Sequence, residues 1–587
     1  MATKLPHVDV VFIGFGLVGS AIAAELGTKT SLKMVALERG PYRDTYPDFI
    51  QDHFDEWRYA VQSDLFMDLS RNTITFRNNK DQTALPMREY GSFLPGNGVG
   101  GAMVHWNGQS WRFLDHFFEY RTHLEQRYGK DFLPEDTRIQ DWGVTYADLE
   151  PYYTQYEEVF GISGKAGNLN GEIQDGGNPF EGPRSKDYPQ APGKIGYGPA
   201  LFKDAAASLG YHPFSSPSAN SPGAYTNPYG LKLGPCNYCG FCERFGCHTG
   251  AKASPILCTV PAALASGNVE IRQFSTVFRI NHSGGKASSV SYFDANGLEV
   301  EQPADLIVLG AWTIENMRLM MLSGIGEIYD PVTERGTVGR NYSYQAGGAG
   351  ATVWFEDKII NRFMGSGAGG VSIDDYNGDN FDHTGLGFFG GGGISVGQSG
   401  ARPIQSFGPL PSDVPAWGSG WKEGVSKWYN RSVSVGFQAE SPAYRQNHAD
   451  LDPNYRDAFG FPLLRITFDW TDNERKMAKW VSENVHTKIA DALGGSIKSV
   501  RGEVTNYSIV PYQSTHVQGG TVMGNDPSTS VVNTSLQSWD VENLFVVGAS
   551  NFPQNAGYNP TGTVGALAYL AADAIINKYL PSPGPLG

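Results

Sequence analysis

The sequence predicts a two-domain α/β protein that begins with a strand, a glycine turn and a helix. The apolar run Val8–Ile13 leads into Gly14-Phe15-Gly16-Leu17-Val18-Gly19, and small and apolar residues at helical spacing follow. A second strand pattern, residues 33–37, ends at Glu38, about twenty residues further along the chain. The length of 587 residues exceeds what one hydrophobic core usually serves, which favours two joined domains.

Each glycine of this turn has a physical role if the unit binds a dinucleotide. Gly14 allows the tight turn, Gly16 lets the backbone approach a pyrophosphate, and Gly19 lets the helix pack close to the strand. The helix N-terminus then holds the phosphate charge, and the carboxylate of Glu38 can bind a pair of ribose hydroxyls. We therefore predict a dinucleotide site. A glycine turn in an α/β domain without a nucleotide is the alternative.

The charge balance narrows the range of partners. The chain carries 45 basic and 60 acidic side chains, a net charge of −15, which argues against nucleic acid and anionic lipid as partners. No apolar run reaches the ~18 residues of a membrane helix, and the N-terminus lacks the pattern of a signal peptide. We expect a soluble protein without its own export signal, which could still cross a membrane folded and bound to a partner that carries one.

A second glycine cluster spans residues 96–108 and is too rich in glycine for a helix interior, but suits backbone that lies against a flat ligand. Apolar residues then recur at helical spacing over 141–158, where Asp148 could cap the helix. Residues 165–235 are rich in Gly, Pro, Asn and Ser and predict a long surface excursion.

Four of the five cysteines fall in one short segment. They are Cys236, Cys239, Cys242 and Cys247, whereas Cys258 stands apart. Successive thiols with two residues between them, followed closely by another, resemble an iron–sulfur ligand run more than a zinc site built from two separated pairs. Disulfides fit poorly, because such close cysteines cross-link almost nothing in a long chain. An iron–sulfur cluster is the leading interpretation, with zinc, or disulfides and free thiols, as alternatives.

The second half of the chain predicts more strands and a second domain. Strands are expected over residues 269–274, 277–280, 287–293 and 304–311. A helix follows over 315–322. Residues 346–500 contain a glycine-rich stretch, 365–400, interleaved with Phe, Tyr and Ile, which indicates a twisted sheet in a substrate domain. The chain closes with a Pro-led helix after Asn559, whose N-terminus can press against a ligand.

These stretches resemble the glucose-methanol-choline (GMC) oxidoreductases over most of the chain. The matching motifs are GFGLVG with Glu38, GNGVGGAMVHW, AWTIENMRLMMLSG, VGRN and VENLFVVGASNFPQNAGYNPTGTVGALAYLAADAI. The resemblance implies an FAD-binding Rossmann-like domain over residues 1–345, with a surface excursion around 110–235 and the iron–sulfur segment 236–258. It further implies a sheet-based α+β substrate domain over 346–500 and a return to the FAD-binding domain over 501–587.

The same resemblance implies the site residues. FAD, and not NAD, would occupy the N-terminal site, and His516 and Asn559 would be the catalytic pair. The implied FAD-binding residues are Gly14, Gly16, Gly19, Glu38, Gly100, Gly101, His105, Asn107, Gly548, Ala549 and Thr561. His105 matches a position at which some family members attach FAD covalently, and packing beside the flavin ring is the alternative.

Within the family, the cysteine segment and the closing stretch are most similar to flavoprotein subunits of membrane-bound flavocytochrome dehydrogenases. Those subunits work with a small subunit that carries the export signal and with a multihaem cytochrome c, which implies a place on the periplasmic side of the bacterial inner membrane. Related subunits are associated with a three-iron cluster at a somewhat different cysteine spacing. The four thiols here also allow a four-iron cluster.

The implied reaction is the oxidation of a secondary alcohol, which needs a hydride acceptor and a base at the hydroxyl. A histidine, with an ordinary pKa of about 6.5, suits the second role. The expected reaction is D-gluconate to 2-keto-D-gluconate, with electrons passing through the cluster to cytochrome c. The alternatives are 2-ketogluconate, sorbitol, fructose or a glucoside oxidised at C3.

Arg112, Arg318 and Arg340 could bind a substrate carboxylate or form structural ion pairs. An alternative from another class is a non-catalytic electron-transfer or zinc-stabilised binding subunit.

Overall fold

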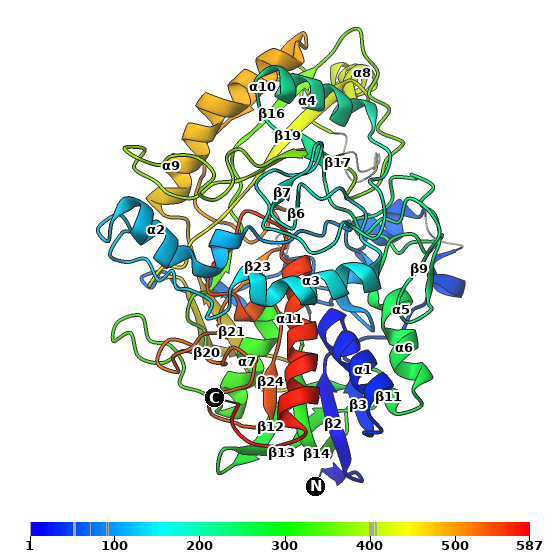
Figure 1. The fold of residues 1–587 in the computed structure, drawn as a ribbon, viewed down its shortest axis with the longest axis vertical. Helices are drawn as coiled ribbons and strands as arrows, with labels where there is room; N and C mark the ends of the chain where they lie inside the picture. The colour runs from blue at the N-terminus through cyan, green and yellow to red at the C-terminus, as the bar shows by residue number, and fades with distance from the viewer. Residues whose placement is uncertain are drawn as a thin grey trace.

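The computed structural model describes residues 2–50, 54–70, 72–89, 91, 93–397, 404 and 408–586. Its largest sheet has eight strands in the order β11-β3-β2-β14-β13-β12, with β1 and β24 also paired to β14. The strands are β1 Thr3–Lys4, β2 Val8–Ile13, β3 Met34–Leu37, β11 Val269–Arg272, β12 Thr276–Ser283, β13 Lys286–Phe293, β14 Glu299–Leu309 and β24 Leu544–Val546. This sheet occupies the lower half of Figure 1, where both chain ends lie.

The long strand β14 joins the two halves of this sheet. Its first residues pair antiparallel with β13, and its last residues pair in parallel with β2 on one side and β24 on the other. The predicted strand at 304–311 therefore begins earlier, at Glu299, because antiparallel pairing continues the strand. The last four residues of β14 and all of β3 are buried, as expected for strands covered on both faces.

The helices α1 (Leu17–Lys29) and α11 (Thr561–Ala574) lie side by side, and α11 also packs on α3 (Tyr146–Phe160) (Figure 1). A Cβ at Gly565 would lie 2.2 Å from the Tyr156 ring, so the small residues of α11 permit this close contact. The predicted closing helix begins at Thr561, and Pro560 precedes its first turn.

One detail of the α3 prediction was wrong. Thr145, and not Asp148, caps the helix. The Thr145 hydroxyl accepts from the Asp148 N–H, while the Asp148 carboxylate accepts from the Thr145 N–H, so the two residues form a reciprocal capping box.

A second, antiparallel sheet has six strands in the order β22-β16-β19-β18-β17-β8. The strands are β8 Phe214–Ser215, β16 Gly350–Trp354, β17 Gly370–Ile373, β18 Gly392–Gly397, β19 Ser432–Ala439 and β22 Ile497–Arg501. The glycine-rich stretch thus forms strands, as predicted, although its residues 398–400 lie outside the described residues. The helices that accompany this sheet are α4 Tyr197–Ser208, α8 Gly418–Trp428, α9 Asp472–Val481 and α10 Thr487–Leu493. Both α4 and β8 come from the stretch predicted as an irregular excursion.

Smaller elements connect the two sheets. A four-stranded sheet contains β20 His448–Arg456, β21 Pro462–Thr467, β4 Thr75–Arg77 and β5 Leu85–Pro86. Two-stranded ribbons pair β15 Ser343–Tyr344 with β23 Val517–Gln518, β6 Asn168–Leu169 with β7 Glu172–Ile173, and β9 Tyr225–Thr226 with β10 Lys232–Leu233. The remaining α-helices are α2 Tyr120–Tyr128, α5 Pro255–Cys258, α6 Val260–Ala265 and α7 Thr313–Ser323.

Short 3₁₀ and π-helical turns complete the fold. They are η1 Thr45–Phe49, η2 Trp57–Val61, η3 Gly101–Val104, η4 Asp115–Glu119, η5 Ser482–His486, η6 Ala549–Asn551 and η7 Ile575–Tyr579.

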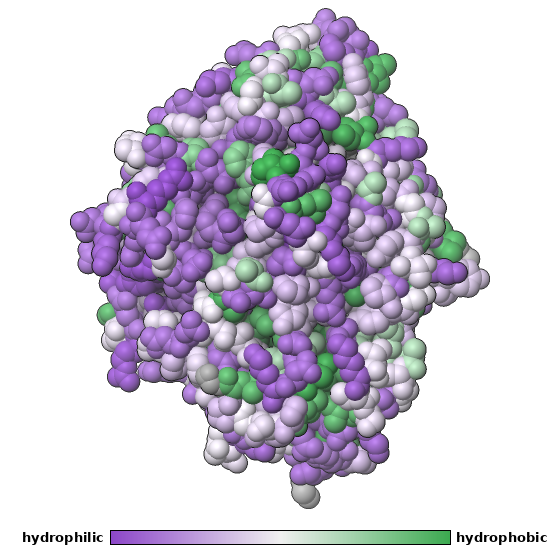
Figure 2. Space-filling view, viewed as in Figure 1, coloured by the Kyte–Doolittle hydropathy of each residue, from purple (hydrophilic) through white to green (hydrophobic). Residues whose placement is uncertain are grey.

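Figure 2 shows a largely hydrophilic face with small, scattered apolar patches, in keeping with the net charge of −15. Among the described residues, no helix combines the length and apolar character needed to cross a bilayer.

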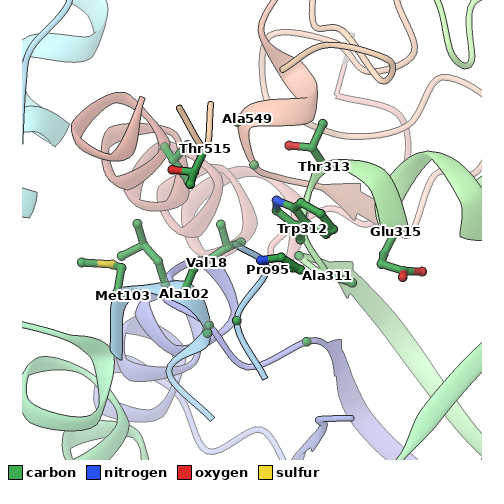
Figure 3. A pocket seen from close by; sticks show the side chains of 18 of the residues that line it. Val18, Pro95, Ala102, Met103, Ala311, Trp312, Thr313, Glu315, Thr515 and Ala549 are labelled. Atoms are coloured by element: carbon green, nitrogen blue, oxygen red, sulfur yellow. The ribbon is translucent and has the colours of Figure 1, made fainter. Parts of the chain in front are cut away.

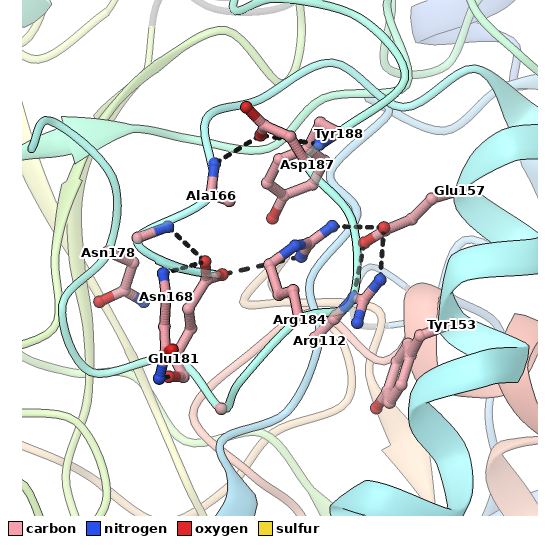
Figure 4. Close-up of polar contacts among 12 residues, drawn as sticks. Arg112, Tyr153, Glu157, Ala166, Asn168, Asn178, Glu181, Arg184, Asp187 and Tyr188 are labelled. Carbon is pink, nitrogen blue, oxygen red and sulfur yellow. Dashed lines mark hydrogen bonds and ion pairs between the residues drawn. The ribbon is translucent and has the colours of Figure 1, made fainter. Parts of the chain in front are cut away.

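A buried ion network fastens the 165–190 region to α3 (Figure 4). The Arg112 guanidinium donates to both carboxylate oxygens of Glu157, at 2.9 and 2.7 Å, and Arg184 donates to the same carboxylate from the other side. All three residues are buried. Burial by itself would raise the pKa of Glu157, but the two guanidinium groups hold that pKa below its usual value. Arg184 also lies over the Tyr188 ring, with its Cζ atom 3.8 Å from the ring centroid.

We expect Arg112→Met to lower the free energy of unfolding by about 3–5 kcal/mol, because it leaves Glu157 with half of its buried countercharge. The measurement is urea denaturation followed by far-UV circular dichroism. The matched control is Lys186→Met, which breaks an ion pair with Glu158 in which the Lys186 side chain is 62% exposed. That control should cost less than about 1 kcal/mol. Equal losses in the two variants would contradict the assignment of the network as a buried structural element.

Candidate functional site

A cavity of about 340 Å³ lies where the parallel strands β2, β3, β14 and β24 end. Its walls include the residues that directly follow these strands, which are Gly14, Glu38, Gly310 and Val547. Figure 3 shows side chains from α1, η3 and α7 around the same space, among them Val18, Met103 and Thr313. Open parallel sheets bind ligands at this edge, because the loops that follow the strands diverge there.

The glycine turn after β2 is packed too tightly for side chains. Gly14 has φ +85°, and a Cβ there would lie 2.8 Å from the Gly310 carbonyl oxygen. A Cβ at Gly19 would lie 2.3 Å from the Gly14 carbonyl oxygen. Gly19 does not line the cavity, so its role is the close helix packing expected of it.

The second glycine cluster faces this turn. A Cβ on Gly16 would lie 3.6 Å from the Cα of Gly101, so the two backbones border the same part of the cavity. Gly100 and Gly101 both have positive φ, +92° and +58°, and lead into η3. A flat ligand between the two loops would contact backbone on both sides.

Glu38 fastens the turn as well as lining the cavity. Its carboxylate accepts hydrogen bonds from the Phe15 N–H at 3.0 Å and from the Gly40 N–H at 2.9 Å. The side chain is therefore held at the end of β3, at the wall of the cavity. Its contact with a ribose stays a prediction.

His105 is a buried histidine with an unused ring nitrogen. It lines the cavity, is 4% exposed, and its Nε2 atom has no hydrogen-bond partner within the described part of the chain. Burial, followed by the positive charge of Lys252, lowers the pKa of His105 to about 3, so the imidazole is neutral near pH 7. The Phe66 ring packs edge-on against it, with the centroids 4.4 Å apart.

His516 and Asn559 meet at the cavity wall. The Asn559 Nδ2 atom lies 2.9 Å from the His516 Nε2 atom, and both residues line the cavity. Burial lowers the pKa of His516 to about 3, which keeps its imidazole neutral. The Oδ1 atom of Asn559 is buried without a partner among the described residues, so it is available to a ligand.

Gln345 is a site residue that the sequence did not indicate. Its Oε1 atom contacts the Nδ1 atom of His516, and its position follows from the pairing of β15 with β23, which sets Tyr344 opposite Val517. A glutamine about 170 positions before the histidine carries no local signal, because only strand pairing brings the two together.

The predicted FAD-binding residues, apart from Gly19, all lie on the cavity wall. They are Gly14, Gly16, Glu38, Gly100, Gly101, His105, Asn107, Gly548, Ala549 and Thr561. They come from segments far apart in the sequence, and the structure brings them to one surface.

None of the five cysteines lines the cavity, although Glu243, between Cys242 and Cys247, does. All five cysteines are free thiols, so the disulfide alternative is wrong for this structure. Burial raises the pKa of Cys242 to about 12, and its Sγ atom accepts from the Gly367 N–H at 3.2 Å. Over the described ranges, no three potential metal-ligating side chains are grouped so as to hold an ion.

A buried lysine joins the cysteine segment to the cavity wall. Lys252 is 2% exposed, and its Nζ atom donates to the carbonyl oxygens of Trp106, Cys242 and Phe245 at 2.7–2.8 Å. Trp106 lines the cavity. The Arg244 N–H also donates to the His105 carbonyl oxygen at 2.7 Å. The segment that carries the thiols is thus bonded directly to the loop beside the cavity.

The three arginines considered as carboxylate ligands have structural roles. Arg112 belongs to the Glu157 network, Arg318 donates to Asp457 at 2.6 Å, and Arg340 lies over the Tyr329 ring. None of them lines the cavity. Arg39 is the one lysine or arginine among the described lining residues, and it is bonded to Asn72 and Glu315.

Comparison with known proteins identifies relatives along the whole chain. Residues 219–346 and 443–568 match the two family models described as GMC oxidoreductase. The chain is 46% identical to the gluconate 2-dehydrogenase flavoprotein of Pantoea cypripedii, covering 100% of this chain and 96% of that protein. It is 26% identical to the fructose dehydrogenase large subunit of Gluconobacter japonicus, covering 98% and 99%. The solved structure of pyridoxine 4-oxidase from Mesorbium loti superimposes with a TM-score of 0.59 at 17% identity, covering 96% and 98% of the two chains.

We expect Gly16→Val to lower the amount of FAD that co-purifies by at least about tenfold, because the branched side chain would fill the space between Gly16 and Gly101. The measurement is the ratio of absorbance at the flavin band to absorbance of protein. The matched control is Gly347→Ala, where a Cβ meets no atom within 4 Å. Full flavin occupancy in Gly16→Val would contradict this placement of the dinucleotide.

Proposed function

The chain belongs to the GMC oxidoreductase family, and we propose that it oxidises the C2 hydroxyl of D-gluconate to give 2-keto-D-gluconate. Family membership makes it an FAD-dependent dehydrogenase that acts on CH–OH donors. The observation that carries the choice of substrate is the 46% identity, over the full chain, to a gluconate 2-dehydrogenase flavoprotein.

The residues on the cavity wall suit FAD in their chemistry. Backbone at Gly14 and Gly16 and the N-terminus of α1 would hold the pyrophosphate, and Glu38 would hold the ribose. When bound there, FAD supplies a hydride acceptor for the substrate carbon. The Nε2 atom of the neutral His105 ring has no hydrogen-bond partner among the described residues. This supports contact between His105 and the cofactor, either through a covalent link or by packing.

His516 would serve as the base that removes the hydroxyl proton. Its neutral imidazole has a hydrogen-bond acceptor at Nε2, where Asn559 now donates. In the proposed reaction the substrate hydroxyl takes the place of this amide and gives its proton to Nε2, while two electrons leave the carbon as hydride. Asn559 would stay beside the substrate oxygen and orient it, because its amide can donate and accept.

A neutral polyol is the second candidate substrate. The catalytic end of the described cavity wall offers amides, such as Gln438 and Asn559, and no lysine or arginine. A buried site that selected for a carboxylate would usually hold a cation against it. This lining favours recognition through hydroxyl groups, so the neutral compounds sorbitol, fructose and glucosides are candidates beside gluconate, whereas 2-ketogluconate carries a carboxylate as gluconate does.

We further propose that the cysteine segment binds an iron–sulfur cluster and conducts electrons away from the flavin. Four thiols within twelve residues, N–H groups directed at Cys242 and Cys247, and the Lys252 bridge to the cavity wall support this proposal. The described side chains do not form a ready metal cage, so cluster binding would require the thiols to rearrange.

The partners follow by analogy with the relatives. One relative is called a large subunit and another a flavoprotein, which supports assembly with other subunits. We propose a cytochrome c subunit as electron acceptor and a small subunit that carries an export signal. This assembly would place the enzyme on the periplasmic side of the bacterial inner membrane.

We expect His516→Ala to lower kcat/KM for dye reduction by about 10²–10⁴-fold with unchanged flavin content, because the proton acceptor is lost. Steady-state dye reduction and the visible spectrum measure the two quantities. The matched control is His7→Ala, which removes an exposed histidine paired with Asp305. A non-catalytic binding subunit would show no substrate-dependent flavin reduction in any of these proteins.

The substrate and the cluster can be tested on anaerobically purified protein. We expect D-gluconate to bleach the flavin band, and iron and acid-labile sulfide to be present together. A panel of gluconate, 2-ketogluconate, sorbitol, fructose and glucosides ranks the candidate substrates. Turnover of a neutral polyol at a rate far above that of gluconate would contradict the gluconate proposal, and zinc without iron would contradict the cluster.

A further inference from the structure

The amide of Gln345 is held at both ends. Gln345 is 1% exposed, its Oε1 atom contacts His516 Nδ1, and its Nε2 atom donates to the Ala556 carbonyl oxygen at 3.3 Å. A carbonyl oxygen can only accept, so the amide nitrogen must face Ala556. The amide oxygen therefore faces the imidazole. This orientation is assigned from the hydrogen-bond network.

The orientation of Gln345 determines the protonation of His516. An amide oxygen is an acceptor, so the Nδ1 atom of the neutral ring must carry the hydrogen and donate it. The Nε2 atom then has a lone pair, which agrees with the Nδ2 group of Asn559 at 2.9 Å as donor. The tautomer that Gln345 requires also fits the contact with Asn559.

The backbone holds the two side chains in register. The Gln345 N–H donates to the His516 carbonyl oxygen at 3.3 Å, and the Asn555 side chain donates to that same oxygen at 3.1 Å. Tyr344 and Val517, the chain neighbours of Gln345 and His516, are paired across the two strands. A slip of one residue would turn either side chain to the opposite face of the ribbon.

We propose that Gln345 is a positioning residue, whose amide holds His516 in the tautomer that leaves Nε2 free to accept the substrate proton. This inference rests on the proposed function, because it takes His516 as the base. It adds a residue that touches neither substrate nor flavin and acts only through the imidazole.

The absence of charge on the Gln345 amide affects the protonation state of His516. Burial alone lowers the pKa of His516. The other ionisable residues that line the described cavity are Glu38, Arg39, His105, Glu243, Glu315 and Tyr512, and none contributes to that shift. A carboxylate at position 345 would accept the same hydrogen bond and favour the imidazolium. The glutamine orients the ring without adding this charge.

The test compares Gln345→Leu with Gln518→Leu in the FAD-loaded enzyme. We expect Gln345→Leu to lower kcat by about 10- to 100-fold, the usual loss when the partner that orients a functional histidine is removed. KM, flavin content and melting temperature should stay near the wild-type values. Gln518 lies two residues from His516, is fully buried, and its amide has no partner among the described residues, so Gln518→Leu should keep wild-type kcat.

A double-mutant cycle separates positioning from other roles. In the His516→Ala background, Gln345→Leu should cause no further loss of flavin reduction rate, because the residue it acts through is gone. In Gln345→Glu, the acid limb of the kcat/KM profile should move to higher pH. Wild-type kcat in Gln345→Leu, a full additional loss in the double variant, or an unmoved acid limb would each overturn the inference. Wild-type activity in His516→Ala would instead overturn the proposed base.

Discussion

The close approach of two glycine-rich loops is the constraint on which this site depends. Gly16 and Gly101 border the same part of the cavity, and any side chain at either position would occupy ligand space. The approach is possible because Gly14 and Gly19 let α1 start directly against the end of β2. The positive end of α1 is thereby directed at the cavity, where phosphate charge is stabilised.

The chemistry at the other end of the cavity depends on long-range assembly. His516 precedes β23, Asn559 precedes α11, and Gln345 follows β15. Their contacts exist because β14 pairs with β24 and β15 pairs with β23, which draws the last part of the chain back over the first sheet. The positions of the proposed base and of the groups that orient it therefore depend on these strand pairings.

Local patterns predicted much of the fold and of the cavity wall. The strand, glycine turn and helix at residues 8–29, the buried part of β14, the strands in the glycine-rich stretch and the last helix all have short-range signatures. The helix α4 was not predicted, because the Gly and Pro residues around it are typical of loops. Its apolar face packs on the second sheet. Arg112 and Gln345 were not assignable from sequence, because a guanidinium or an amide acquires its role from partners distant in the chain.

The shared carboxylate of Glu157 has a consequence for how this chain can evolve. It pairs with Arg112 and Arg184 at once, and all three side chains are buried. Replacing Glu157 alone leaves two buried guanidinium groups without this carboxylate, and replacing either arginine alone removes hydrogen bonds from it, whereas replacing all three by apolar residues of similar volume removes these contacts together. Single substitutions are therefore costly intermediates. We expect Arg112, Glu157 and Arg184 to change together or not at all among related proteins. Their shared presence would then indicate common descent even between relatives that act on different substrates.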